Sequence, residues 1–101
     1  MSIVCRESAQ SSNEVLIEVS GHFDFTEQKA FRDAYLQYPA DMSYRVDLSC
    51  ADYLDSSALG MLLLLRQHAG EQSEKVKLVG ASNAVMKILN IANFDKLFTF
   101  E

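Results

Sequence analysis

The sequence has 101 residues, 49% of them apolar, which suits one domain with a hydrophobic core. Its formal net charge of −5 argues against nucleic acid as a partner, because an acidic surface repels phosphate backbones. The longest apolar run, residues 61–65, is far too short to span a membrane, and the N-terminus lacks the basic start and apolar run of a signal peptide. We therefore expect a cytoplasmic protein without a membrane or nucleic-acid partner.

The cysteines and histidines give no sign of a metal site or of a disulfide. Cys5 and Cys50 lie far apart and form no Cys-x-x-Cys pair, and His22 and His68 add no metal-ligand spacing. We expect both thiols to be reduced, and neither a metal nor another cofactor to be bound.

The period at which apolar residues recur switches along the chain between two residues, typical of strands, and about 3.6 residues, typical of helices. This predicts strands that alternate with helices. In chain order the pattern predicts strands at 3–6 and 15–20, a helix at 26–38, a strand at 44–48, a helix at 58–69, a strand at 76–79, a helix to about 91 and a strand at 97–100. Asp24 or Thr26 is expected to cap the first helix, and Gly70 to end the second. Ser82 or Asn83 should cap the third.

The order β-β-α-β-α-β-α-β predicts an α/β fold, with a mixed sheet of about five strands and helices mainly on one face. We expect a single domain over 1–101. The side chains expected to be buried are Ile17, Val19, Val46, Leu48, Leu63 and Val79. Binding sites in such sheets gather at the C-terminal ends of strands, which here indicates the loops at 21–25, 49–57 and 80–83.

The turn Asp55-Ser56-Ser57, at the start of an apolar helix, is the most informative part of the sequence. Three capping-type residues stand in a row where one cap would suffice. Gly60 in the first turns costs about 1 kcal/mol relative to Ala, and a glycine there usually admits the close approach of another backbone. The free amides of a helix N-terminus also suit a phosphate. A purely structural interpretation, in which these residues only cap the helix, stays open.

Residues 54–60, Leu-Asp-Ser-Ser-Ala-Leu-Gly, following Val46-Asp47-Leu48, resemble the STAS family, the anti-sigma factor antagonists. Residues 15–24 resemble the second strand of that family and its Gly-x-hydrophobic-Asp turn, and residues 76–91 resemble its fourth strand and third helix. The similarity covers almost the whole chain. One departure is Ala58, where the family commonly has Gly. Its added methyl is expected to slow phosphorylation or to restrict partners, although Ala suits a helix better.

The resemblance implies a non-catalytic signalling module with a phosphorylation switch. In the family, the serine directly after the Asp accepts phosphate from a partner that is both kinase and anti-sigma factor, and a separate serine phosphatase removes it. Here that serine is Ser56, and the implied module binds its partner when dephosphorylated and leaves it when phosphorylated. The chain also resembles stand-alone members that govern motility and biofilm formation in some bacteria, whose partners join kinase-like and phosphatase domains in one response regulator.

We expect Ser56 to lie at the exposed helix start and Ser57 to be used in capping amides. The residues expected to surround Ser56 or to contact the partner are Asp24, Asp55, Ser57, Ala58, Gly60, Ser82 and Asn83. Asp24 and Asp55 would orient the Ser56 hydroxyl or bind a cationic group of the partner, unless both serve only as caps.

Two other functional classes stay open. A small-ligand or nucleotide sensor would use the same helix N-terminus, although the chain has no glycine-rich phosphate loop. A serine hydrolase would need a base near Ser56. His68 lies about three turns along the helix, which is too far, and His22 lies in a loop that could approach. No Gly-x-Ser-x-Gly elbow surrounds Ser56.

Overall fold

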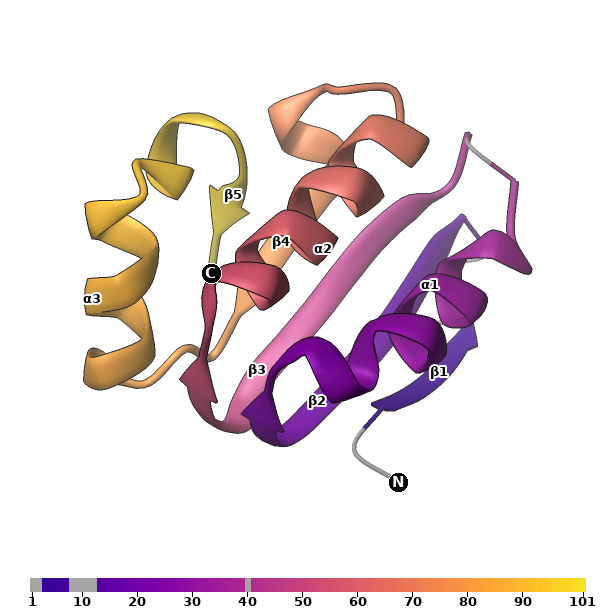
Figure 1. Cartoon of the computed structure of the whole chain (residues 1–101). Coiled ribbons are helices and arrows are strands. Elements are labelled where there is room, and N and C mark those ends of the chain that lie inside the picture. Colours follow the sequence, from indigo (N-terminus) through magenta and orange to yellow (C-terminus); the bar gives the residue numbers. More distant parts are fainter. Residues whose placement is uncertain (1–2, 8–12, 40) are drawn as a thin grey trace.

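The computed structural model describes residues 3–7, 13–39 and 41–101. Its five strands form one sheet in the order β1-β2-β3-β4-β5 (Figure 1). The strands are β1 (Ile3–Glu7), β2 (Glu14–Phe23), β3 (Ser43–Leu54), β4 (Val76–Val79) and β5 (Thr99–Phe100). β1 pairs with β2 antiparallel and the other pairs are parallel, so the sheet is mixed, as predicted.

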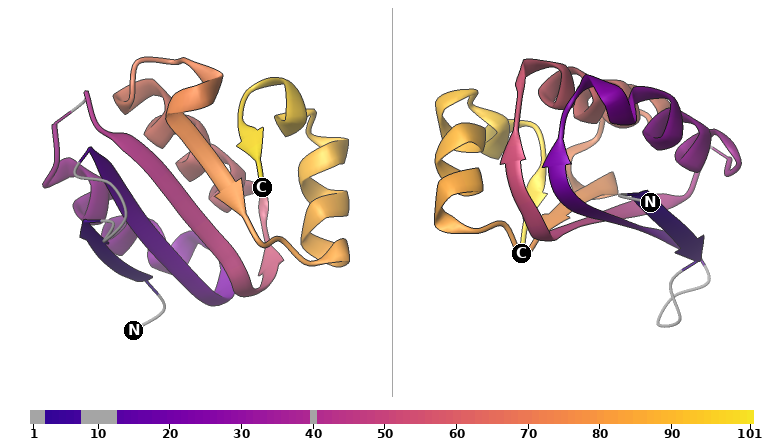
Figure 2. Two further views of the ribbon diagram at one scale, coloured as in Figure 1. Left: turned by 180° about the vertical axis from the view of Figure 1, so that it is seen from behind. Right: turned by 60° about the horizontal axis from the view of Figure 1, so that its bottom comes forward.

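Three helices accompany the sheet: α1 (Gln28–Leu36), α2 (Ser56–His68) and α3 (Asn83–Ile91). α1 and α2 lie side by side across one face, and α3 stands beside the β4–β5 edge (Figures 1 and 2). The opposite face carries no helix from the described part of the chain (Figure 2). The expected α/β fold with helices mainly on one face is therefore confirmed. No described helix is long and apolar enough to cross a membrane.

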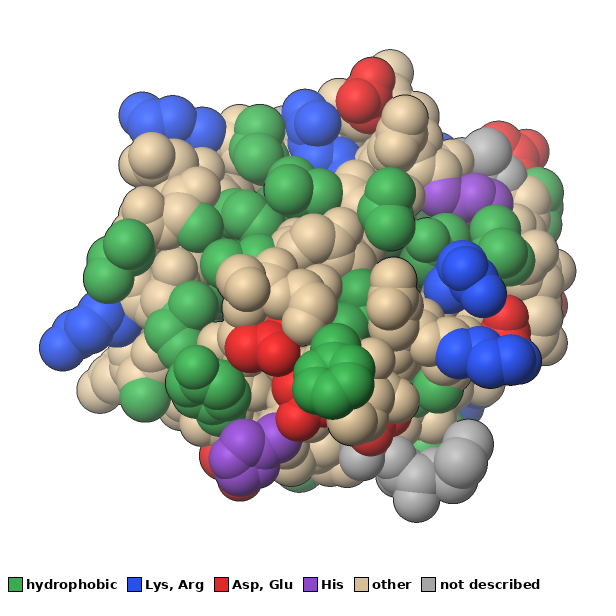
Figure 3. Space-filling model, viewed as in Figure 1, with side chains coloured by type: hydrophobic (Ala, Val, Ile, Leu, Met, Phe, Trp, Pro, Cys, Tyr) green, Lys and Arg blue, Asp and Glu red, His purple; other side chains and the backbone are tan. Residues whose placement is uncertain are grey.

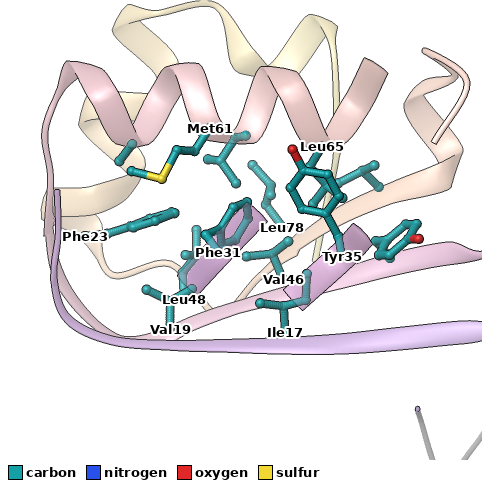
Figure 4. Packing of buried hydrophobic residues seen from close by; sticks show 14 of the residues in the cluster. Ile17, Val19, Phe23, Phe31, Tyr35, Val46, Leu48, Met61, Leu65 and Leu78 are labelled. Carbon is teal, nitrogen blue, oxygen red and sulfur yellow. The ribbon is translucent and has the colours of Figure 1, made fainter. Parts of the chain in front are cut away.

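Side chains along β2 and β3 point alternately to the two faces of the sheet, and those that point to the helices form the core. Every second side chain points to the helices, and these side chains are fully or almost fully buried: Val15, Ile17, Val19, Tyr44, Val46 and Leu48. Figure 4 shows Phe31 and Tyr35 of α1, and Met61 and Leu65 of α2, packed above them. Burial of each such side chain stabilises the fold by about 1.5–3 kcal/mol. This core layer therefore fixes the positions of the turns that follow the strand ends.

The two long strands extend further than the sequence predicts. Residues 49–55 were expected to form a loop, but β3 continues to Leu54 and β2 runs through Gly21 to Phe23. The register between them shifts at Glu18/Ser20 and again at Gly21/His22, so β3 carries extra residues as bulges. Bulges interrupt the alternation of apolar residues, which is why the pattern indicated a loop. The two strand ends bend together toward the helix side (Figure 2).

The helix ends follow local signals in part. Asp24 caps a 3-10 turn, Phe25–Glu27, that precedes α1, whereas α1 itself has Glu27 at its N-cap position without a side-chain cap, so neither Asp24 nor Thr26 caps it as expected. Ser82 caps α3, as one of the two expected caps, and Gly70 follows α2 with a φ of +96° that favours glycine. The last strand is shorter than the predicted 97–100, since only Thr99–Phe100 pairs with β4.

Burial on α2 differs from the prediction. The helix buries Ala58, Met61, Leu62 and Leu65. Leu63, expected to be buried, is 40% exposed, and Val79 is only half-buried because it alternates with the buried Leu78 of β4. Residues 58–65 of α2 are apolar on nearly every side, so the hydrophobic pattern does not select one face.

Candidate functional site

The start of α2 is built around the carboxylate of Asp55. Its Oδ1 accepts hydrogen bonds from the backbone N–H of Ala58 at 2.9 Å and from the Ser57 hydroxyl at 2.8 Å. The Ala58 N–H is the main cause that holds the pKa of Asp55 below its usual value, followed by the Ser57 hydroxyl and the backbone N–H groups of Ser57 and Phe25. Asp55 is therefore ionised at neutral pH, and its charge is stabilised by groups of the protein itself.

Ser56 and Ser57 have different surroundings. Ser57 is half-buried and its hydroxyl is bonded to Asp55. Ser56 is the first residue of α2 and is exposed, and its hydroxyl makes no hydrogen bond within the described chain. The exposure of Ser56 agrees with the expectation. The expected capping by Ser57 is wrong, because Asp55 is the cap and Ser57 donates to it.

A second turn of the same construction lies beside the first. Phe23 and Leu54 are register partners on β2 and β3, and an aspartate follows each of them. Asp24 Oδ1 accepts from the Thr26 backbone N–H at 3.0 Å and from the Thr26 hydroxyl. The Asp55 N–H donates to the Phe23 carbonyl at 3.3 Å and so joins the two turns. Asp24, Asp55, Ser56 and Ser57 therefore lie together, and both aspartates serve as caps.

Ala58 and Gly60 belong to different parts of α2. The Ala58 side chain is fully buried in the core, and its N–H is already bonded to Asp55. Its methyl therefore cannot contact a partner, contrary to the expectation for this residue. Gly60 is half-buried, and a Cβ added there would meet no atom within 4 Å. The fold itself does not require a glycine at this position.

Ser82 and Asn83 lie at the start of α3. The Ser82 hydroxyl accepts a hydrogen bond from the Val85 N–H at 3.3 Å, which makes Ser82 a helix cap. Asn83 lines a shallow groove along α3 with Met86, Lys87, Asn90 and Ile91. In the described chain no hydrogen bond or ion pair joins either residue to the Asp55 turn, although the starts of α2 and α3 lie toward the same end of the sheet (Figure 1).

The histidines are placed away from Ser56. The His68 Nε2 lies 3.1 Å from the Tyr38 carbonyl oxygen at the far end of α2, and its ring packs on Tyr35. The His22 Nδ1 lies 3.3 Å from a carboxylate oxygen of Asp52. Neither is paired with the Ser56 hydroxyl, so the geometry of a serine hydrolase is not formed here. Among the described residues, no cluster of three or more His, Cys, Asp or Glu could hold a metal ion.

Phe25 is a residue of this site that was not among the residues predicted from the sequence. Its phenyl ring is 68% exposed and it projects from the turn next to Asp55. The signal was present, because an apolar residue directly after a capping aspartate lies outside the apolar stripe of the following helix.

Comparisons with known proteins show the family of this chain. A family model described as "Mlab, STAS domain" matches residues 7–99. The chain belongs to the STAS family. A STAS-domain containing protein of Pseudomonas aeruginosa (strain UCBPP-PA14) is 48% identical over 99 residues, which covers 97% of this chain and 97% of the relative.

Solved anti-sigma factor antagonists share the fold of this STAS domain. One from Mycobacterium paratuberculosis matches with a TM-score of 0.77 at 19% identity, covering 97% of this chain and 82% of that one. SpoIIAA in its unphosphorylated form matches with a TM-score of 0.71 at 15% identity, covering 98% and 86%. The Bacillus cell fate determinant SpoIIAA in its phosphorylated form matches with a TM-score of 0.62 at 13% identity, covering 97% and 91%. At these identities the likeness shows the fold.

Proposed function

We propose that this STAS domain is a non-catalytic, phosphorylation-switched protein-binding regulator of the anti-sigma factor antagonist type. The unphosphorylated form binds a kinase that is also an anti-sigma factor, or another regulator, and phosphate on Ser56 ends that binding. The observation that supports this proposal is the Ser56 hydroxyl, which is exposed and unbonded at the N-terminus of a 13-residue helix. Its neighbours on both sides, by contrast, are held by hydrogen bonds.

The position suits a phosphate without requiring a change of fold. A phosphoserine adds about −1.5 to −2 charges at neutral pH. The positive end of the helix dipole stabilises an anion there by about 0.3–2 kcal/mol. Asp24 and Asp55 oppose it by like-charge repulsion, so the net effect on the free energy of unfolding is small.

Binding responds differently, because a partner that covers this turn must remove water from the phosphate. Burying an ion without a countercharge costs several kcal/mol. Since each 1.4 kcal/mol is about tenfold in affinity, the affinity falls by about a hundredfold or more. The switch is local and electrostatic, with no large rearrangement of the domain.

The proposal extends to the machinery around the protein. Besides the kinase, it requires a serine phosphatase that restores the free Ser56 hydroxyl. Both enzymes act in the cytoplasm. The two activities belong either to one response regulator or to two separate proteins. Regulation of transcription, motility and biofilm formation is the setting that the family resemblance suggests. The solved forms of SpoIIAA with and without phosphate support a family whose fold persists through phosphorylation.

Mapping the phosphate tests the proposal directly. The purified protein is incubated with ATP and a lysate of the source bacterium, and the modified residue is located by mass spectrometry. We expect the phosphate on Ser56, no label in Ser56→Ala, and normal label in the matched control Ser57→Ala, whose hydroxyl is held by Asp55. Equal labelling of Ser56→Ala and the wild-type protein would refute the assignment.

A further inference from the structure

Phe25 has no role in the core of this fold. Its side chain is 68% exposed and belongs neither to the buried cluster nor to the half-buried residues packed against it. A phenylalanine offers about 150–250 Å² of surface for burial, so a partner that covers this ring gains apolar burial that the fold leaves unused.

The paired turns place Phe25 next to the phosphorylation site. In each turn an aspartate caps, the next side chain projects outward, and the third residue donates its hydroxyl back to the aspartate. Phe25 holds the outward position in the first turn and Ser56 holds it in the second. The Asp55 backbone N–H donates to the Phe23 carbonyl at 3.3 Å, so the two turns are held relative to each other.

Acidic residues predominate in the segments that form these turns. Residues 20–27 and 49–65, which include the strand ends, both turns and most of α2, contain no Lys or Arg, and their acidic residues are Asp24, Glu27, Asp52 and Asp55. Figure 3 shows acidic side chains gathered with exposed apolar ones on the lower part of this face, while the Lys and Arg side chains lie elsewhere on it. Complementary charge on a partner would therefore be positive.

We propose that Phe25 is the main contact of the protein partner, and that its ring is covered by an apolar patch of the partner flanked by Lys or Arg side chains. The cations meet Asp24 and Glu27, which adjoin Phe25 in the sequence, and the apolar patch adjoins Ser56. Large aromatic side chains in the centre of an interface commonly carry much of the binding energy. This inference rests on the proposed function, because phosphate on Ser56 would lie against the patch that covers Phe25.

A displayed library of twelve-residue peptides, selected on the intact protein, tests the inference without a known partner. We expect selected peptides to combine apolar residues with Lys or Arg. Their affinities are then measured for the wild-type protein, for Phe25→Ala and for the control Ile91→Ala, which removes a side chain 78% exposed on α3. Phe25→Ala should weaken binding by about tenfold or more, Ile91→Ala should not, and both variants should keep the melting temperature of the wild-type protein.

Failure to select any peptide, or equal binding of the peptides to Phe25→Ala and the wild-type protein, would overturn the assignment of Phe25. A protein carrying genetically encoded phosphoserine at position 56 separates this result from the proposed switch. Peptides that need Phe25 but tolerate the phosphate uphold the contact and contradict the switch. Peptides that lose affinity with the phosphate but ignore Phe25 uphold the switch and contradict the contact.

Discussion

Asp55 determines the state of the two serines that follow it. Its carboxylate holds the Ala58 N–H and the Ser57 hydroxyl, which leaves only Ser56 with a free hydroxyl in this turn. Phosphate on Ser57 would remove a bond to an ionised carboxylate and place a dianion beside it in a half-buried position. The choice between two adjacent serines thus follows from one capping side chain.

The stability contributed by Asp55 should depend on pH in a defined direction. Its pKa lies below the ordinary value of 3.8 in the folded protein, chiefly because of the Ala58 N–H. A carboxyl group with a lowered pKa stabilises the fold above its unfolded pKa, and this contribution is lost as the pH falls through the folded pKa. Asp55→Ala should lower the melting temperature by roughly 4–8 °C at neutral pH, and the difference should shrink below about pH 4.

Melting curves of both proteins between about pH 2.5 and 7 measure this effect. Asp52→Ala is the matched control, since Asp52 is exposed and its ion-pair partner, His22, is also exposed. It should change the melting temperature little. A difference between Asp55→Ala and the wild-type protein that stays constant down to the lowest pH would contradict the assigned role of Asp55.

Helix α2 combines a buried side with an apolar outer side. Ala58, Met61, Leu62 and Leu65 pack on the sheet, whereas Leu63 and Leu64 are 40% and 49% exposed. Gly60 lies on the same helix one turn after Ser56, and the fold leaves room for a side chain there. Contact of Gly60 with a partner therefore stays a prediction, which a substitution at this position tests.

Gly60→Ala should therefore separate stability from binding. It should raise the free energy of unfolding by up to about 1 kcal/mol, because alanine is the better helix former and its Cβ meets nothing. The partner is first isolated by affinity capture on the Ser56→Ala protein, which the proposed switch keeps in its binding form. Gly60→Ala should weaken binding of this captured partner by about tenfold or more if the partner's backbone approaches here. Urea denaturation and a binding titration measure the two effects.

Ala58→Gly is the contrasting change on the same helix. It removes a fully buried methyl, so it should lower the free energy of unfolding by about 1 kcal/mol while leaving the affinity of the folded protein unchanged. If Gly60→Ala binds the partner as tightly as the wild-type protein, or if Ala58→Gly alters the affinity, the division of α2 into a core side and a partner side is wrong.

At the scale of the whole molecule, the sequence predicted the order of elements well and the extent of some of them poorly. Strand β4 was predicted with its observed bounds, and its buried Val76 and Leu78 alternate with the half-buried Lys77 and Val79. The bulged end of β3 was missed, since extra residues break the alternation by which strands are recognised.

The site was predicted in part for similar reasons. The Asp55 turn was identified because capping residues before an apolar helix are a strong local signal. The exposure of Phe25 had a local signal, but its nearness to Ser56 could not be predicted, because it arises from the parallel pairing of two strand ends. The buried face of α2 was also undetermined, since a helix that is apolar on nearly every side is oriented by its neighbours and not by its own pattern.

The central claim is that phosphate on Ser56 changes the surface of this domain and not its fold. The most direct test compares unmodified protein with protein carrying genetically encoded phosphoserine at position 56, in melting temperature and in affinity for the captured partner. We predict a melting temperature within about 3 °C of the unmodified value and an affinity lower by about a hundredfold or more. Phosphorylation that unfolds the domain, or that leaves the affinity unchanged, would contradict this account.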